Sequence, residues 1–248
     1  MTTTTKPGLT PGALDGQQDN RGPVYLEGKE KRAVYRISSL GQCQAAVLAH
    51  LLPNDGWDGP APIPYHQRIA MEAGHEFEEA VKGWLEQEHR VTITEEQAAV
   101  EIPVGGALLR GHIDGVAVVD DRFCEGWGLD PKWAGAKLLF EAKNMGKGPF
   151  ADWTVDGIGG RPEYGLQLTA YMKALGVDGA LYVVGERGWT PAKEAEGEPR
   201  LTGRLIITVI TAQTPGMPNW ATIAKRVIAL EKARKLGEVG CCTGSKYS

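Results

Sequence analysis

One long segment of the chain repeats apolar residues every three or four positions, the spacing of one face of an α-helix. Residues 67–89 predict a long helix, and residues 163–175 predict a shorter one that ends at Gly176. A terminal helix is expected over residues 220–236. The apolar positions of the long helix are Ile69, Ala73, Phe77, Val81 and Trp84.

Between these helices lie short runs rich in β-branched residues, as strands are. Gly105 and Gly106 separate two of the runs and predict a hairpin turn. The order is helix, three or so strands, helix, strand, which predicts an α/β fold with a mixed sheet flanked by helices. The expected strands are residues 91–94, 99–104, 107–119, 138–143, 180–184 and 205–210.

Length and composition predict one large domain. The chain has 248 residues, of which 42% are apolar and 23% charged, values ordinary for a globular protein. Residues 1–30 are rich in Thr, Gly, Pro, Gln and Asp and predict a poorly ordered arm, which leaves residues 31–248 as the domain. No apolar run approaches the ~20 residues of a membrane span. The N-terminus has no apolar signal-peptide core, so we expect a cytoplasmic protein with no membrane partner.

Charge and cysteine content narrow the function classes. A net charge of −4 does not favour binding of nucleic acid to the surface as a whole. A nuclease, however, needs only a local basic groove and uses acidic residues to bind metal. The chain lacks a Gly-x-x-x-x-Gly-Lys-Ser/Thr loop, which argues against part of a helicase. Without an extracellular context, the cysteines predict free thiols. They are Cys43, Cys124, Cys241 and Cys242.

Acidic residues interrupt two of the expected strands. Asp114 lies within the run 107–119, and Glu141 lies within the run 138–143, two residues before Lys143. Side chains two apart on a strand project from one face, and acids within apolar strands are usually paired or bind a cation. Two carboxylates and a lysine would suit magnesium-assisted attack on a phosphodiester. The alternative is a Glu–Lys pair on the solvent face of a surface strand.

Helical positions add further candidates. Met71, Glu78 and Leu85 are seven apart, so Glu78 borders the buried stripe of the long helix and can reach inward. Gln167 and Tyr171 are four apart and share a face of the later helix, where they could hold a phosphate or brace the lysine. The alternatives are an exposed acid, an ordinary glutamine and a tyrosine at the edge of the core.

Phosphate contacts are expected outside the acidic cluster. Arg36 with Ser38 or Ser39 as the cap opens a helix predicted over residues 36–51, and free N–H groups at a helix N-terminus bind phosphate. Lys147, in a loop after the acidic strand, and the basic terminal helix could contact a DNA backbone. Simple capping and solvated lysines are the alternatives.

Four stretches, taken in order, resemble the PD-(D/E)xK nuclease superfamily. The resemblance covers residues 34–185 and is to the branch that holds the RecB nuclease domain, the CRISPR-associated adaptation nucleases, and the YqaJ and lambda-type phage exonucleases. Each stretch is weak alone, and four in sequence are fairly specific. They are residues 74–78 (Gly-x-x-x-Glu), 111–114 (ending in Asp), 141–143 (Glu-x-Lys) and 167–171 (Gln-x-x-x-Tyr).

The resemblance implies a restriction-endonuclease-like αβββαβ core and a DNA exonuclease that depends on Mg²⁺ or Mn²⁺. It implies Glu78, Asp114 and Glu141 as metal ligands, joined by the carbonyl of Ala142, with Lys143 as a catalytic residue. The expected setting is phage-type recombination, replication or repair.

The resemblance also implies the partners. DNA, as duplex or single-stranded ends, is the expected substrate, contacted or supported by Gln167 and Tyr171 and gripped at a terminal phosphate by Arg36 with Ser38 or Ser39. A single-strand annealing or recombination protein and further copies of the chain are the expected protein partners.

The chain departs from the family pattern in three ways. Ile113 replaces the proline before the aspartate, and the separation of Asp114 and Glu141 by 27 positions implies an insertion around residues 120–136. Some relatives hold a [4Fe–4S] cluster on one early and three late cysteines. Here the late pair, residues 241–242, is adjacent, so we do not expect a cluster. Two alternatives stay open: a cluster-bearing adaptation-type nuclease, and a catalytically silent DNA-binding protein.

Overall fold

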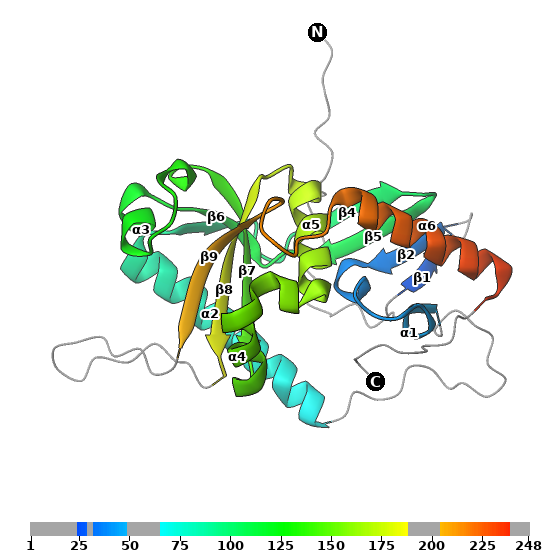
Figure 1. The fold of residues 1–248 in the computed structure, drawn as a ribbon, viewed down its shortest axis with the longest axis horizontal. Coiled ribbons are helices and arrows are strands. Elements are labelled where there is room, and N and C mark those ends of the chain that lie inside the picture. The colour runs from blue at the N-terminus through cyan, green and yellow to red at the C-terminus, as the bar shows by residue number, and fades with distance from the viewer. Residues whose placement is uncertain (1–23, 29–31, 49–64, 188–203, 239–248) are drawn as a thin grey trace, which may run out of the picture.

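The computed structural model describes residues 24–28, 32–48, 65–187 and 204–238. Its fold is mixed α/β, with two mixed sheets flanked by helices (Figure 1). One sheet has the strand order β1-β2-β5-β4 and the other β3-β6-β7-β8-β9. The strands are β1 (Val24–Glu27), β2 (Arg32–Arg36), β3 (Thr92–Thr94), β4 (Ala99–Val104), β5 (Ala107–His112), β6 (Gly115–Val118), β7 (Lys137–Met145), β8 (Gly179–Glu186) and β9 (Leu205–Thr211).

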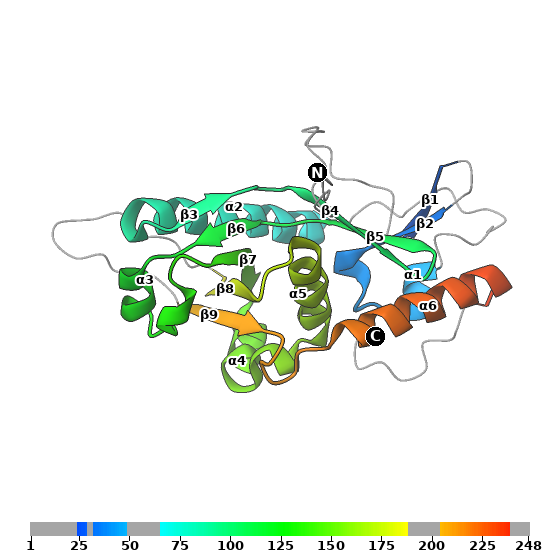
Figure 2. The ribbon, with the colours of Figure 1, turned by 90° about the horizontal axis from the view of Figure 1, so that it is seen from above.

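The helices form layers on both faces of the five-stranded sheet. Seen from above, α2 lies along one face, while α4 and α5 lie on the other (Figure 2). Helix α6 packs against α5 and β4. The helices are α1 (Gln44–Leu48), α2 (Tyr65–His89), α3 (Asp121–Gly126), α4 (Lys147–Asp156), α5 (Pro162–Leu175) and α6 (Trp220–Leu236), with 3₁₀ turns η1 (Ile37–Ser39), η3 (Pro131–Trp133) and η4 (Gly157–Gly160).

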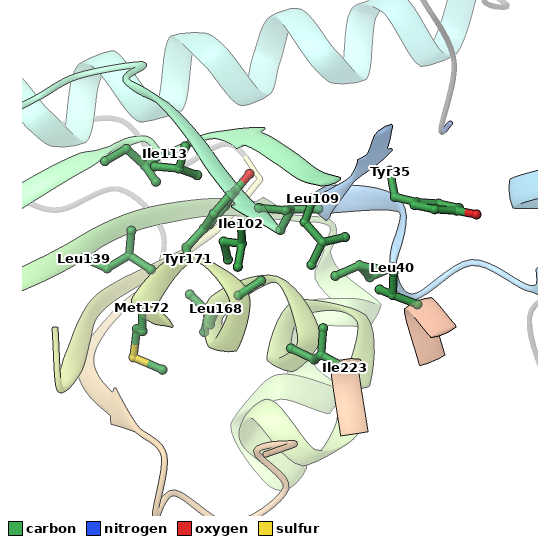
Figure 3. Packing of buried hydrophobic residues seen from close by; sticks show 14 of the residues in the cluster. Tyr35, Leu40, Ile102, Leu109, Ile113, Leu139, Leu168, Tyr171, Met172 and Ile223 are labelled. Atoms are coloured by element: carbon green, nitrogen blue, oxygen red, sulfur yellow. The ribbon is translucent and has the colours of Figure 1, made fainter. Parts of the chain in front are cut away.

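Strand β7 separates two apolar cores because its side chains alternate between the faces of the sheet. Leu138 and Phe140 pack with Phe77 and other residues of α2. Leu139 faces the opposite way, into the core under α5 (Figure 3). Glu141 follows the parity of Leu139, which places its carboxylate on the α5 side.

A long hairpin passes from one sheet to the other and bends on the way. β3 pairs with β6 in the five-stranded sheet, and β4 pairs with β5 in the four-stranded sheet. The bend lies where residues 95–98 face Ile113 and Asp114, and Ile113 N–H donates to the carbonyl of Ala98 at 3.1 Å. The expected single strand 107–119 is therefore wrong at its centre: it is two strands, in different sheets, with Asp114 at the corner.

The N-terminal region differs most from the expectation. Residues 24–27, assigned to a poorly ordered arm, form β1 and pair with β2, while residues 1–23 lie outside the described residues. The helix predicted over 36–51 is wrong in its first half: Arg36 ends β2, a 3₁₀ turn follows, and α1 begins only at Gln44. Strand pairing explains why no helix opens at Arg36, because Arg36 pairs with Arg110 of β5 as the last residue of β2.

The remaining expectations are closer to the structure. The helix 67–89 is confirmed as α2, although Ile69 is exposed because the first turns of α2 extend beyond the sheet (Figure 1). The terminal helix is confirmed as α6 with the predicted bounds. Gly176 ends α5 with φ +67, as expected. The loop predicted around Lys147 is wrong, since β7 runs to Met145 and α4 begins at residue 147.

Two cysteines lie among the described residues and differ in state. Cys43 is disulfide-bonded, which corrects the expectation of a free thiol at that position. Cys124 is a free thiol, fully buried. Cys241 and Cys242 lie outside the described residues. None of the described helices is both long and apolar enough to span a bilayer.

A buried carboxylate fastens α6 to β2. Glu231 accepts a hydrogen bond from the Tyr35 hydroxyl at 2.6 Å and two from Arg234 at 2.9 Å. Burial alone would raise the pKa of Glu231, but the hydrogen bonds from Arg234 and Tyr35 outweigh it and lower the pKa below its ordinary value of 4.5.

Acid is therefore expected to weaken the attachment of α6. A lowered pKa in the folded state contributes stability above the unfolded value of about 4.5, and this contribution is lost as the pH falls through the folded-state value. Glu231→Gln should be about 1–3 kcal/mol less stable than wild type at pH 7, with the difference shrinking toward pH 3. Urea unfolding across this pH range measures it. A constant difference would contradict the assignment.

Candidate functional site

Asp114 occupies the corner where the hairpin leaves the five-stranded sheet. The last paired residues of β6 and β7 are Gly115 and Phe140. Beyond them, the backbone N–H of Ala142 donates to Oδ2 of Asp114 at 3.0 Å. The aspartate thus takes over a hydrogen bond that strand pairing no longer provides, and this fixes its carboxylate beside the strand that carries Glu141.

Glu141 is almost fully buried, with 1% of its surface exposed. Its Oε1 accepts hydrogen bonds from Nζ of Lys143 and from Nε2 of Gln167, the latter at 2.9 Å. Its Oε2 is buried and has no hydrogen-bond partner among the residues that the structure describes. Burial, and then the neighbouring Asp114 carboxylate, raise the pKa of Glu141 to about 8. The site therefore holds a carboxylate oxygen that is costly to leave without a proton or a cation.

Lys143 shares one face of β7 with Glu141, as the two-residue spacing predicts. Its ammonium also lies 5.8 Å from the centre of the Tyr164 ring. Burial lowers the pKa of Lys143, but Glu141 and Asp114 outweigh it and hold the pKa well above its ordinary value. The lysine is therefore a permanent cation inside the site.

Glu78 comes from α2 and is 8% exposed. Its Oε1 accepts hydrogen bonds from Nζ of Lys82 at 2.7 Å and from Nε2 of Gln97 at 2.9 Å. Burial, and then the carboxylate of Asp114, raise its pKa. The charge of Asp114 therefore acts on the Glu78 carboxylate. The Glu78 side chain points inward from the helix, as its position beside the apolar stripe predicts.

Helix α5 closes the site from the other side. Gln167 holds Glu141, and the pKa of Tyr171 is raised by burial and then by Glu141. A Cβ on Gly111 would lie 2.6 Å from the Tyr171 hydroxyl, so the Gly–His–Ile–Asp stretch has a glycine where the tyrosine crosses the strand. Tyr171 rises from α5 among the buried side chains of the core (Figure 3).

The expected phosphate-binding residues do not join this cluster. Within the described ranges, no hydrogen bond or ion pair links Arg36, Ser38, Ser39 or Lys147 to the acidic residues. The 3₁₀ turn η1 packs against α5, and Ser39 is buried while Ser38 is exposed. The three residues therefore do not open an α-helix as predicted, and their role toward DNA stays a prediction, as does that of Lys147, the first residue of α4.

Three residues next to the site were not predicted from the sequence. Lys82 follows Glu78 by four positions, a spacing that pairs side chains on a helix. Tyr164 precedes Gln167 by three positions, so the same rule could have found it. Gln97 carries no sequence signal, because it reaches Glu78 only through the bend of the hairpin.

The donor set suits a hard divalent cation. Among the residues that the structure describes, no three His, Cys, Asp or Glu side chains already form a ready-made metal-binding group. The carboxylates of Asp114 and Glu141 nevertheless lie near enough for the charge of Asp114 to raise the pKa of Glu141, and Oε2 of Glu141 is buried with no partner among the described residues. Oxygen donors of this kind are those that Mg²⁺ binds, with waters completing its coordination.

Comparisons with known proteins were made for the whole chain. No protein-family model matches it, and no curated protein matches it. Among solved structures, it is similar to LHK-Exo in complex with dAMP, with 15% identity, a TM-score of 0.48, and coverage of 82% of this chain and 88% of that one. It is also similar to SSO0001, with 14% identity, a TM-score of 0.41, and coverage of 86% and 79%.

Proposed function

We propose that the protein is a divalent-metal-dependent deoxyribonuclease that hydrolyses phosphodiester bonds at DNA ends, in recombination, replication or repair of the phage type. The observation that supports this most is the buried Oε2 of Glu141, which has no partner among the described residues, on a carboxylate whose pKa the charge of Asp114 raises. Folding alone gains nothing from such an oxygen, because an unsatisfied buried polar atom costs about 1–3 kcal/mol.

Mg²⁺ or Mn²⁺ would be held by Asp114, Glu141 and the carbonyl of Ala142, with Glu78 directly or through water. When bound, the ion would neutralise charge on the phosphate and lower the pKa of the attacking water. Two hydrogen bonds orient these ligands before a metal binds. The Ala142 N–H donates to Oδ2 of Asp114, and Gln167 donates to Oε1 of Glu141, which leaves Oε2 for the metal. Fixed ligands of this kind lose little entropy when a cation arrives.

Lys143 would stabilise negative charge on the phosphate that is cleaved. Its ammonium is charged at any physiological pH and is held between Glu141 and the face of Tyr164. A fixed positive charge in a partly buried site stabilises the negative charge that develops when water attacks phosphorus and the leaving oxygen departs. The aromatic ring would keep bulk water away from one side of the ammonium.

The test is digestion of end-labelled linear duplex and closed circular DNA by the full chain, with Mg²⁺, Mn²⁺ or EDTA. We expect shortening of the linear DNA with either metal, no reaction in EDTA, and intact circles. Parallel substrates with 5′- and 3′-phosphates would give the polarity. The proposal fails if linear DNA survives with every divalent ion, and its exonuclease part fails if circles are cut equally well.

A further inference from the structure

The bend in the hairpin that carries Asp114 on one strand has an unusual backbone on the other. Glu95 and Gln97 have φ values of +55 and +50, in the left-handed region that residues other than glycine seldom adopt. The two residues lie between β3 and β4, at the step from one sheet to the other. Strain of this kind persists only where surrounding contacts hold it, and it gathers at functional sites.

The bulge formed by residues 95–97 reaches back to helix α2. Gln97 donates to Oε1 of Glu78 at 2.9 Å, and Glu96 accepts from Lys82 at 3.0 Å. Lys82 is 4% exposed and also donates to Glu78 at 2.7 Å. The bulge and one turn of α2 are thus joined by two hydrogen bonds, Gln97 to Glu78 and Lys82 to Glu96, and Lys82 also donates to the Glu78 oxygen that accepts from Gln97.

The two carboxylate oxygens of Glu78 differ in their hydrogen bonds. Oε1 takes both hydrogen bonds, from an ammonium and from an amide. No described residue donates to Oε2. A carboxylate held through one oxygen has a fixed plane, and its other oxygen is left for a ligand, the arrangement in which neighbouring groups orient a metal ligand.

We propose that Gln97 and Lys82 are positioning residues that hold Glu78 ready for a divalent cation, so that the Gln97 side chain of the bulge opposite Asp114 supports the metal-binding site. The inference rests on the proposed function, because it concerns the same cation. It goes further in assigning a role to a segment that contributes no ligand of its own.

The bulge offers a matched pair of variants. Glycine relieves the backbone strain at either position, since it adopts positive φ freely. Gln97→Gly also removes the amide that holds Glu78, whereas Glu95→Gly changes an exposed side chain that does not contact Glu78. A role confined to folding predicts that the two variants behave alike toward metal.

The measurement is calorimetric titration of the full-length chain with Mn²⁺ in the absence of DNA, alongside thermal unfolding without metal. We expect Gln97→Gly to bind Mn²⁺ roughly tenfold more weakly than wild type, and Glu95→Gly to bind it like wild type, with both unfolding near the wild-type temperature. In DNA cleavage, Gln97→Gly should raise the metal concentration needed for half-maximal rate while leaving the rate at saturating metal within about twofold.

Further variants keep the test decisive if glycine at position 97 unfolds the protein. Gln97→Met keeps the length of the side chain without its donor and should weaken Mn²⁺ binding similarly. Lys82→Arg should preserve binding better than Lys82→Met. Unchanged Mn²⁺ affinity in folded Gln97→Gly or Gln97→Met overturns this inference alone. A wild-type chain that binds no Mn²⁺ and cleaves no DNA overturns the proposed function and this inference with it.

Discussion

Lys143→Met and Asp114→Asn are each expected to lower metal-dependent DNA cleavage by roughly two to three orders of magnitude or more. Lys143→Met removes the fixed positive charge while keeping a side chain of similar length beside Tyr164. Asp114→Asn removes the negative charge that a cation needs but retains an oxygen to accept the hydrogen bond from Ala142, which lies 3.0 Å from Oδ2 in the wild type. The rate of release of an end label, measured at saturating DNA, checks both.

Matched controls separate lost chemistry from lost folding. Lys137→Met changes an exposed lysine at the start of the same strand, and Asp178→Asn changes an exposed aspartate before β8. Both should cleave at the wild-type rate. Circular dichroism should show all four variants folded. Cleavage at the wild-type rate by folded Lys143→Met or Asp114→Asn would refute the assignment of these residues.

Gly185→Val is expected to destabilise the protein by about 3 kcal/mol, the upper part of the range for overpacking a core. Gly185 lies on β8 directly beneath α2, and a Cβ there would lie 2.5 Å from Cζ of Phe77 and closer still to Cε2. Phe77 is buried, so its ring has little room to move away. Chemical denaturation of the metal-free protein measures the loss.

The consequence should extend to the site, because Phe77 immediately precedes Glu78 on α2. Displacing the ring is expected to shift the helix turn that carries the carboxylate and to weaken Mn²⁺ binding in whatever fraction stays folded. Gly83→Ala is the control on the same helix: an added Cβ meets only ordinary contacts, and alanine favours helix over glycine by about 1 kcal/mol. Equal stability of Gly185→Val and wild type would show that α2 can lift from the sheet without cost.

Local spacing was enough to predict the parts of the site that lie within one element. Glu141 and Lys143 share a face because strand side chains alternate, and the structure brings them into contact. Gln167 was placed on one helix face with Tyr171, and its amide reaches Glu141. Glu78 was placed at the edge of an apolar stripe and is buried there. The side-chain repeat of a strand, 2 residues, and that of a helix, 3.6 residues, decide which side chains share a face, independently of the rest of the chain.

The failures of prediction share a different cause. No strand was predicted at residues 32–36, yet Val34 pairs with Leu108, 74 positions further along the chain. Gly185 was left outside the predicted strand, and the residues around it in the sequence do not indicate that it packs against Phe77. Pairing between distant segments cannot be read from either segment alone.

The sequence by itself determined the α/β class, the long helix, the terminal helix, the shared strand face of Glu141 and Lys143, and the shared helix face of Gln167 and Tyr171, since each follows from the repeat of one element. Only the tertiary structure decided that the hairpin divides between two sheets at Asp114, that Gln97 crosses the bend to Glu78, that Gln167 reaches Glu141, and that one oxygen of Glu141 is buried without a partner among the described residues. These features arise where separate elements exclude water together, and the free energy of a buried charge depends on every group that surrounds it.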